Sequence, residues 1–209
     1  MNFTAFTALL ALGSSQAAPT NPAFFPTAFR TATVACRSTG QVKPIEILSS
    51  LEENWYSGQL AAAREMPLYK ARAQRSVRSG TVLRFTWLRS FHAPVFVRVD
   101  GLGTPKARLV AKQLSGHGGY APGSIRKSLD RALSPNEAHD IQLALRRSDI
   151  VHMQPRTCDF GLDGAEWVME VVDAHGYHFI DRQSPTSGGE RDLGLSLLRL
   201  TGWDVRPIY

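Results

Sequence analysis

The residue types that could do chemistry gather in one stretch near the C-terminal end of the chain, from Gly161 to Pro185. This stretch carries a carboxylate, an imidazole and a guanidinium at Glu170, His178 and Arg182. An arginine can hold an anion with a fork of hydrogen bonds, and a carboxylate can orient a histidine. We therefore interpret the trio as an anion-binding or polar-ligand site. The alternative is a structural Glu–Arg bridge with a histidine beside it.

A predicted β-hairpin would place this trio on one face. A three-residue loop ending at Gly176 would pair Asp173 with Tyr177. In that register the three polar side chains share a face and lie within reach of one another. Slipping the pairing by one residue would move the histidine and the arginine onto the apolar face with Trp167 and Met169, which burial disfavours. The pattern therefore predicts the first register.

Two more cations and an aromatic residue extend the candidate ligand-binding site. Arg98 and Lys112 would join the same face if the polar side of the preceding strands continues into the hairpin, and the pocket would then be electropositive. The glycine-rich loop Gly116–Gly123 could let backbone approach a ligand, with Tyr120 as an aromatic wall. A strand-like segment follows the loop, so dinucleotide-binding and P-loop interpretations fail. The alternative for the loop is a tight surface turn.

Other kinds of site lack their sequence signatures. His92, His117 and His178 could converge, but no HExxH and no paired Cys/His spacing accompanies them, so we predict no metal site and no cofactor. No GxSxG nucleophile elbow is present either. No residue can be assigned as catalytic from the sequence.

The elements that must position these residues follow from periodicity. Helices are expected over about 45–64, after an N-cap at Ser134, and over about 190–201. Alternating apolar residues predict strands at about 82–91, 94–100, 108–114 and 125–133, ahead of the hairpin. Their connections are too short for crossovers, so the strands form an antiparallel meander. The predicted fold class is α+β: an antiparallel sheet of five to six strands, a meander plus the C-terminal hairpin, with helices on one face.

The N-terminal residues resemble an export signal. Phe3 to Leu12 is an apolar run, and Ser15 to Ala17 offers small residues for cleavage, although no Lys or Arg lies in the short preceding region. A misplaced start codon or an uncleaved apolar arm are the alternatives. We expect a signal peptide at 1–17, an extended leader at 18–40 and one α+β domain at 41–209. The apolar run is too short to span a bilayer, and we expect no transmembrane anchor.

Cysteine use and charge add to this interpretation. Cys36 and Cys158 suit an oxidising compartment, and pairing them would close a long loop worth about 4–5 kcal/mol in the chain-entropy model. Two buried thiols are the alternative. The formal charge of the 209-residue chain is +6, and its arginines are scattered, with the densest group at Arg72, Arg75 and Arg78. This scatter argues against nucleic-acid binding and leaves a weak attraction to an anionic envelope polymer or membrane surface.

An ordered set of motifs resembles a known family. The motifs are FHxPxxxR from Phe91, GGYxPG from Gly118, GxDGxxWxxE from Gly161 and YHxxxRxSP from Tyr177. Together they resemble a family of small, uncharacterised exported bacterial proteins, over roughly Ile45 to Trp203. Gln183 stands where that family's pattern has tryptophan, which affects packing beside the hairpin arginine. The resemblance implies export and a shared fold, and it supplies no activity.

The function expected from the sequence is therefore that of an exported, periplasmic or secreted soluble protein that holds an anionic or polar partner. The partner is a small molecule, an envelope polymer or a protein. One alternative is an envelope hydrolase or transferase that uses His178 or Glu170 as acid or base. Another is a structural component whose Glu170 face is buried against a second chain.

Overall fold

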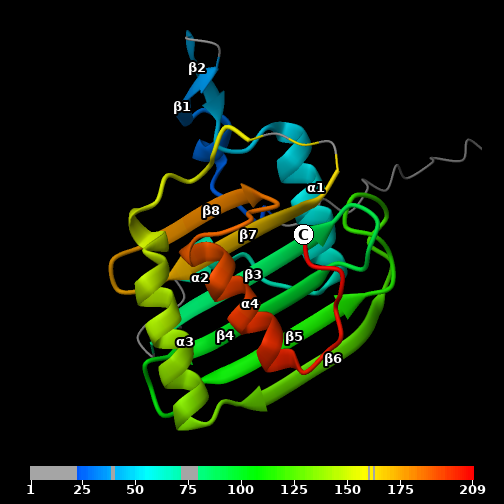
Figure 1. The fold of residues 1–209 in the computed structure, drawn as a ribbon, viewed down its shortest axis with the longest axis vertical. Helices are drawn as coiled ribbons and strands as arrows, with labels where there is room; N and C mark the ends of the chain where they lie inside the picture. The colour runs from blue at the N-terminus through cyan, green and yellow to red at the C-terminus, as the bar shows by residue number, and fades with distance from the viewer. Residues whose placement is uncertain (1–22, 39–40, 72–79, 160, 162) are drawn as a thin grey trace, which may run out of the picture.

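The computed structural model describes residues 23–38, 41–71, 80–159, 161 and 163–209. Its main feature is a six-stranded antiparallel sheet with strand order β6-β5-β4-β3-β7-β8 (Figure 1). Strands β3 to β6 form a meander and β7 and β8 form the C-terminal hairpin, so the predicted α+β fold class is confirmed. The strands are β3 (Thr81–Arg89), β4 (Val95–Leu102), β5 (Arg108–Leu114), β6 (Ile125–Ala132), β7 (Ala165–Val172) and β8 (Tyr177–Gln183).

Capping boxes fix the start of two helices. Ser134 caps α3 (Pro135–Ser148) as predicted, and Ser49 caps α1 (Ser50–Ala62) in the same way, with Glu52 bonding back to the cap. Because of that second cap, α1 begins later than the periodicity suggested. A third long helix, α4 (Gly189–Thr201), ends at Gly202 in the left-handed conformation, also as predicted. A short helix, α2 (Leu68–Ala71), follows α1.

The sheet is covered on both faces. Helices α3 and α4 cross the near face in Figure 1 and bury a core centred on Trp87 and Trp167. Helix α1 lies over the opposite face, where Tyr56 and Leu60 pack with Phe96 and neighbouring strand residues. We call these the α3/α4 face and the α1 face. We expected helices on one face of the sheet only. Helices α3 and α4 do share one face, but α1 covers the other.

The segment expected to be an extended leader is part of the folded domain where it is described. Phe24 and Phe25 are fully buried in the core beneath α1. A 3-10 turn, Thr27–Arg30, leads into β1 (Thr33–Ser38), which pairs with β2 (Gln41–Glu46) in a small separate sheet. Burial of two phenylalanines and strand pairing give this segment a role in stability. The expected signal peptide lies outside the described residues, as do Arg72, Arg75 and Arg78.

Cys36 and Cys158 form a disulfide, which confirms the predicted pairing. Their Cα atoms lie 5.4 Å apart, within the usual range for a disulfide. The bond ties β1 to the segment that precedes β7, across 122 positions of sequence. Among the described residues, no helix has the length and apolar character needed to cross a membrane.

Candidate functional site

The C-terminal hairpin adopts the register that the sequence argument rejected. Val172 pairs with Tyr177 and Val171 with His178, one residue out of the predicted alignment. The reason is the turn: the Asp173 carboxylate accepts hydrogen bonds from the backbone amides of His175 and Gly176, at 2.8 and 2.9 Å. This Asx-type arrangement stabilises a loop that contains Asp173 itself, so the predicted three-residue loop is wrong.

The shift separates the predicted trio. Glu170 lies opposite Phe179 on the α1 face, whereas His178 and Arg182 lie opposite Val171 and Trp167 on the α3/α4 face. The convergence of the three side chains was therefore a wrong prediction. Consequently, His178 and Glu170 cannot act together as acid and base on one substrate.

Burial does not exclude Arg182 from the apolar face, because its guanidinium finds backbone partners. It donates to the carbonyl oxygens of Gln154 and Asp181, both at 2.8 Å, while its stem packs beside the core. His178 sits near the hairpin turn, where its Nε2 lies 3.5 Å from the Asp173 carboxylate. Backbone acceptors thus relieve the penalty of burying Arg182, whereas His178 Nε2 is buried without a hydrogen-bond partner among the described residues.

Glu170 belongs to a buried ion-pair network that the sequence did not reveal. Arg84 Nε donates to Glu170 Oε2 at 2.7 Å, and the Tyr177 hydroxyl donates to Oε1 at 3.0 Å. Neither Arg84 nor Glu170 has exposed surface. Burial raises the pKa of Glu170, with Arg84 opposing that change. The Glu170 face is thus covered within this chain, and covering it requires no second chain.

Arg98 and Lys112 do lie on the face of Glu170, as expected, but they do not form an open pocket there. Both pair with Glu65, and the distance from Lys112 Nζ to Glu65 Oε1 is 2.5 Å. Burial alone would raise the pKa of Glu65, but the cations around it hold that pKa below its usual value. We call Glu65, Arg84, Arg98, Asp100, Lys112 and Glu170 the Arg84 network; Asp100 also pairs with Arg98, so three cations face three carboxylates.

The glycine-rich loop is attached to α1. Trp55 Nε1 donates to the Gly118 carbonyl oxygen at 2.6 Å, and Gln59 Nε2 donates to the same oxygen at 3.0 Å. A Cβ atom at Gly118 would come within 2.5 Å of the Arg89 backbone nitrogen, so only glycine allows this approach. Tyr120 remains 62% exposed, with its ring against that of Phe91. The loop is therefore held rigidly beside an exposed aromatic pair.

A cavity of about 390 Å³ opens beside this loop. The end of β3, the turn after it, the loop, β6 and the C-terminal segment contribute to its lining. Cationic and imidazole side chains dominate, and we call it the basic pocket. Its charged and histidine residues are Arg89, His92, His117, Arg126, Lys127, Asp204 and Arg206.

Arg89 is the buried cation of the basic pocket. Its guanidinium packs on the Trp87 ring at 4.3 Å and donates to the carbonyl oxygens of Val205 at 2.6 Å and Ala93 at 2.8 Å. Only 2% of Arg89 is exposed, and within the described part of the chain it forms no ion pair. Burial lowers its pKa, and the charge of Tyr209 opposes that change without cancelling it.

Burial and nearby cations lower the pKa of His92, and nearby cations lower that of Asp204, the carboxylate of the basic pocket. His92 Nδ1 lies 2.6 Å from the Tyr209 hydroxyl. Burial, Arg89 and His117 lower the pKa of His92. Asp204 pairs with Arg206 at 2.9 Å, and that pairing lowers the pKa of Asp204 to about 2. The pair is neutral as a unit, so Arg89, Arg126 and Lys127 leave the pocket positively charged.

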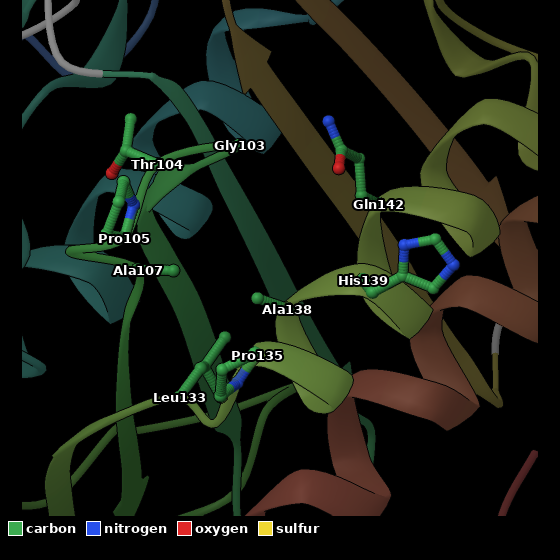
Figure 2. A pocket seen from close by; sticks show the side chains of 9 residues that line it. All are labelled: Gly103, Thr104, Pro105, Ala107, Leu133, Pro135, Ala138, His139 and Gln142. Carbon is green, nitrogen blue, oxygen red and sulfur yellow. The ribbon is translucent and has the colours of Figure 1, made fainter.

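Figure 2 shows a larger cavity, of about 490 Å³, between the turn after β4 and the first turns of α3. Its lining is mainly apolar and includes Leu133, Pro135 and Ala138. His139 and Gln142 project from α3 at its side. This cavity gathers no group of charged side chains, so its size alone does not suggest a chemistry.

The three histidines considered for metal binding are not brought together. His92 and His117 line the basic pocket, whereas His178 lies on edge strand β8. Within the described ranges, no group of three His, Cys, Asp or Glu side chains is arranged to hold a metal ion.

Comparison with known proteins does not assign this chain to a family. No family model matches it, and no curated protein matches its sequence. Its function must therefore be inferred from the chemistry of the pockets.

Proposed function

We propose that this protein is an exported binding protein whose basic pocket holds an anionic ligand through a carboxylate, phosphate or sulfate group. The observation that carries the proposal is Arg89: a buried guanidinium without an ion-pair partner among the described residues, beside a cavity that Arg126 and Lys127 also line. An anion in this cavity supplies the missing negative charge and receives charge-assisted hydrogen bonds.

The dimensions of the basic pocket suit a small molecule or one unit of a polymer. Its volume of about 390 Å³ falls within the roughly 300–1,000 Å³ typical of ligand pockets. Phe91 lines the rim and stacks with exposed Tyr120, so an apolar portion of the ligand finds an aromatic surface there. This supports an acidic small molecule or an acidic envelope polymer as the partner. From the sequence we expected Tyr120 to form an aromatic wall near Glu170. We now propose that it has this role beside the basic pocket, through its contact with Phe91.

Export is part of the proposal and is supported by two features. The Cys36–Cys158 disulfide is typical of proteins that fold in an oxidising compartment. The apolar N-terminal sequence with small residues at Ser15–Ala17 is typical of a cleavable signal. Both features favour the periplasm or the extracellular medium, where acidic polymers are available as partners.

Titration calorimetry with citrate and inorganic phosphate tests the proposed function. The variant Arg126→Ala/Lys127→Ala removes two exposed cations of the pocket and should lower citrate affinity by about tenfold or more. Arg146→Ala/Arg147→Ala removes two equally exposed cations from α3 and is the matched control, expected to change affinity less than about twofold. Equal losses in both variants, or no binding of either anion to the unmodified protein, would contradict the proposal.

A further inference from the structure

A smaller cavity of about 170 Å³ lies on the α1 face of the sheet, where β7 and β8 meet α1. Two carboxyl side chains line it, Glu166 of β7 and Asp181 of β8. Asp181 pairs with Val168, so Glu166 is its diagonal neighbour on the same face. We call this the acidic cavity. Its lining residues are Leu51, Glu52, Trp55, Arg156, Thr157, Asp159, Gly161, Glu166, Asp181 and Gln183.

Asp181 is buried and incompletely satisfied. Only 3% of the residue is exposed. Its Oδ2 accepts a hydrogen bond from the Tyr56 hydroxyl at 3.0 Å. Its Oδ1 is buried and receives no hydrogen bond from any amide, hydroxyl or guanidinium group of the described residues. The neighbour that can serve this oxygen is Glu166, and a hydrogen bond between two carboxyl groups requires that one of them keeps its proton.

The guanidinium that lines the acidic cavity has a different carboxylate partner. Arg156 Nη1 donates to Glu52 Oε2 at 2.9 Å, and Glu52 also accepts from the Ser49 amide at 2.8 Å as part of the α1 capping box. Arg156 and Glu52 therefore largely cancel each other. The charge of the Glu166–Asp181 pair remains in excess, with Asp159 adding to it at the rim.

Protonation of the pair follows from this imbalance. Burial raises the pKa of both carboxyl groups, and the charge of Asp181 adds to the rise at Glu166. Arg156 acts against the rise at both groups, Glu52 acts with it, and the Tyr56 hydrogen bond lowers the pKa of Asp181. At neutral pH the pair therefore holds one proton, which an incoming positive charge can replace.

An aromatic ring forms another wall of the acidic cavity. Trp55 lines it from α1, and its indole is held in place by the hydrogen bond from Nε1 to the Gly118 carbonyl oxygen. The electron-rich face of an indole attracts cations, most strongly where water is partly excluded. Two carboxyl groups and a fixed indole are the groups that an ammonium or guanidinium ion prefers.

We propose that the acidic cavity binds a small organic cation, an ammonium or guanidinium group, between Glu166 and Asp181 and against Trp55. This goes beyond the anion site, since the ligand has the opposite charge and Glu166 lies on the opposite face of the sheet from Arg89. A cavity of about 170 Å³ accommodates a head-group and is smaller than the roughly 300 Å³ at which pockets for whole drug-sized ligands begin. On binding, the shared proton leaves to solvent, both carboxylates become ionised, and no covalent bond to the ligand forms.

The test titrates the full chain with methylguanidinium chloride and n-butylammonium chloride at pH 6, 7 and 8. Since each bound cation displaces a proton, affinity should rise by up to about tenfold per pH unit. At pH 7 about one proton should be released per ligand, measured in buffers of different ionisation enthalpy. Affinity that does not change with pH, or binding without proton release, would overturn the proposal.

Two variants test whether cation binding and proton release take place in the acidic cavity. Glu166→Gln keeps the size and hydrogen-bonding capacity of the partially exposed side chain but removes its proton linkage. It should weaken cation binding about tenfold or more and abolish proton release. Glu137→Gln changes a carboxylate that pairs with Arg131 near the start of α3, and it should leave both readouts unchanged. Loss of binding in both variants, or in neither, would contradict the assignment, as would binding of Ca²⁺ without binding of either organic cation.

A further comparison tests whether the bound cation is a side chain of a protein or a free small molecule. A Gly-Arg-Gly peptide with blocked ends is compared with methylguanidinium under the same conditions. Tighter binding of the peptide assigns the cavity to arginine side chains of a protein partner, and tighter binding of methylguanidinium assigns it to free small cations. Failure of this whole experiment leaves citrate binding at the basic pocket unaffected, so the two proposals stand or fall separately.

Discussion

The α1 face of the sheet carries two groups of buried carboxyl side chains, and they differ in how their charge is balanced. In the Arg84 network, Arg84, Arg98 and Lys112 balance Glu65, Glu170 and Asp100. In the acidic cavity, the neighbours of Glu166 and Asp181 among the described residues include Tyr56, which donates to Asp181, and Arg156, which is bound to Glu52. Glu65, Glu170 and Asp181 are buried, and Glu166 is partly exposed. Whether opposite charges balance the carboxylates therefore distinguishes a structural cluster from a ligand-binding site better than the depth of burial does.

Breaking the Arg84 network should have the largest effect. Arg84→Met leaves Glu170 buried without its cation, and the free energy of unfolding should fall by about 3–5 kcal/mol. Urea denaturation measures the loss. Arg84→Met/Glu170→Leu removes both charges and should recover most of it, because apolar replacements of a buried ion pair are often tolerated. A loss below about 1 kcal/mol in the single variant would mean that the network does not stabilise the fold.

The disulfide should affect the two pockets differently, because it holds a segment that lines the acidic cavity and none that lines the basic pocket. Cys36→Ser/Cys158→Ser should lower the free energy of unfolding by about 2–4 kcal/mol, measured by urea denaturation. Because Cys158 lies between Thr157 and Asp159, which line the acidic cavity, binding of methylguanidinium should weaken more than binding of citrate. An equal loss at both pockets would show that the disulfide acts on the domain as a whole.

The stability of the protein should also depend on the proton held by Glu166. Burial and Asp181 raise the pKa of Glu166 to about 9 in the folded protein, whereas in the unfolded chain it lies near 4.3. Between those values the folded state binds more protons, so the stabilisation present at low pH is lost as pH rises towards the folded pKa.

Thermal unfolding from pH 5 to 9 measures this loss, compared between the unmodified chain and Glu166→Gln. The part of the decline that is attributable to Glu166 should disappear in the variant. Parallel curves for the two proteins would refute the shared proton. Glu137→Gln again serves as the control, because its carboxylate has a lowered pKa and titrates at acidic pH.

The smallest expected effect lies in the basic pocket. Citrate should move the pKa of His92 upward by about one pH unit, because an anion offsets the nearby cations that lower it. NMR titration of the imidazole resonances with and without citrate checks this. The resonances of His139, which lies on α3 by another cavity, provide the internal reference. A downward shift at His92 would place the anion elsewhere.

Much of the fold could be predicted because its signals are local. Alternating apolar residues located β3 to β6, and the box formed by Ser134 and Glu137 located the start of α3. The pairing of Cys36 with Cys158 followed from the chemistry of the compartment that the N-terminal sequence suggested. Each of these inferences depends on residue types and short spacings, which a sequence states directly.

The candidate sites could not be predicted, because they depend on contacts between distant segments. One carboxylate, Asp173, fixes the hairpin register, and its side chain outweighs the burial argument that favoured the other alignment. Arg84 meets Glu170, and Glu65 meets Lys112, only after separate strands and α1 have come together. Asp181 was unsuspected because only the observed register puts it on the face of Glu166. An aspartate directly after the apolar residues Phe179 and Ile180 of a strand was the available signal.

Helix α1 touches both of the sites that we propose. The indole of Trp55 is a wall of the acidic cavity, and its N–H holds Gly118, next to His117 of the basic pocket. Trp55 of α1 thus connects the two proposed binding sites. If a cation displaces the indole and changes anion affinity by some factor, thermodynamic linkage requires the anion to change cation affinity by the same factor. A change in the fluorescence of Trp55, one of the four tryptophans of the chain, would then report the occupancy of both pockets.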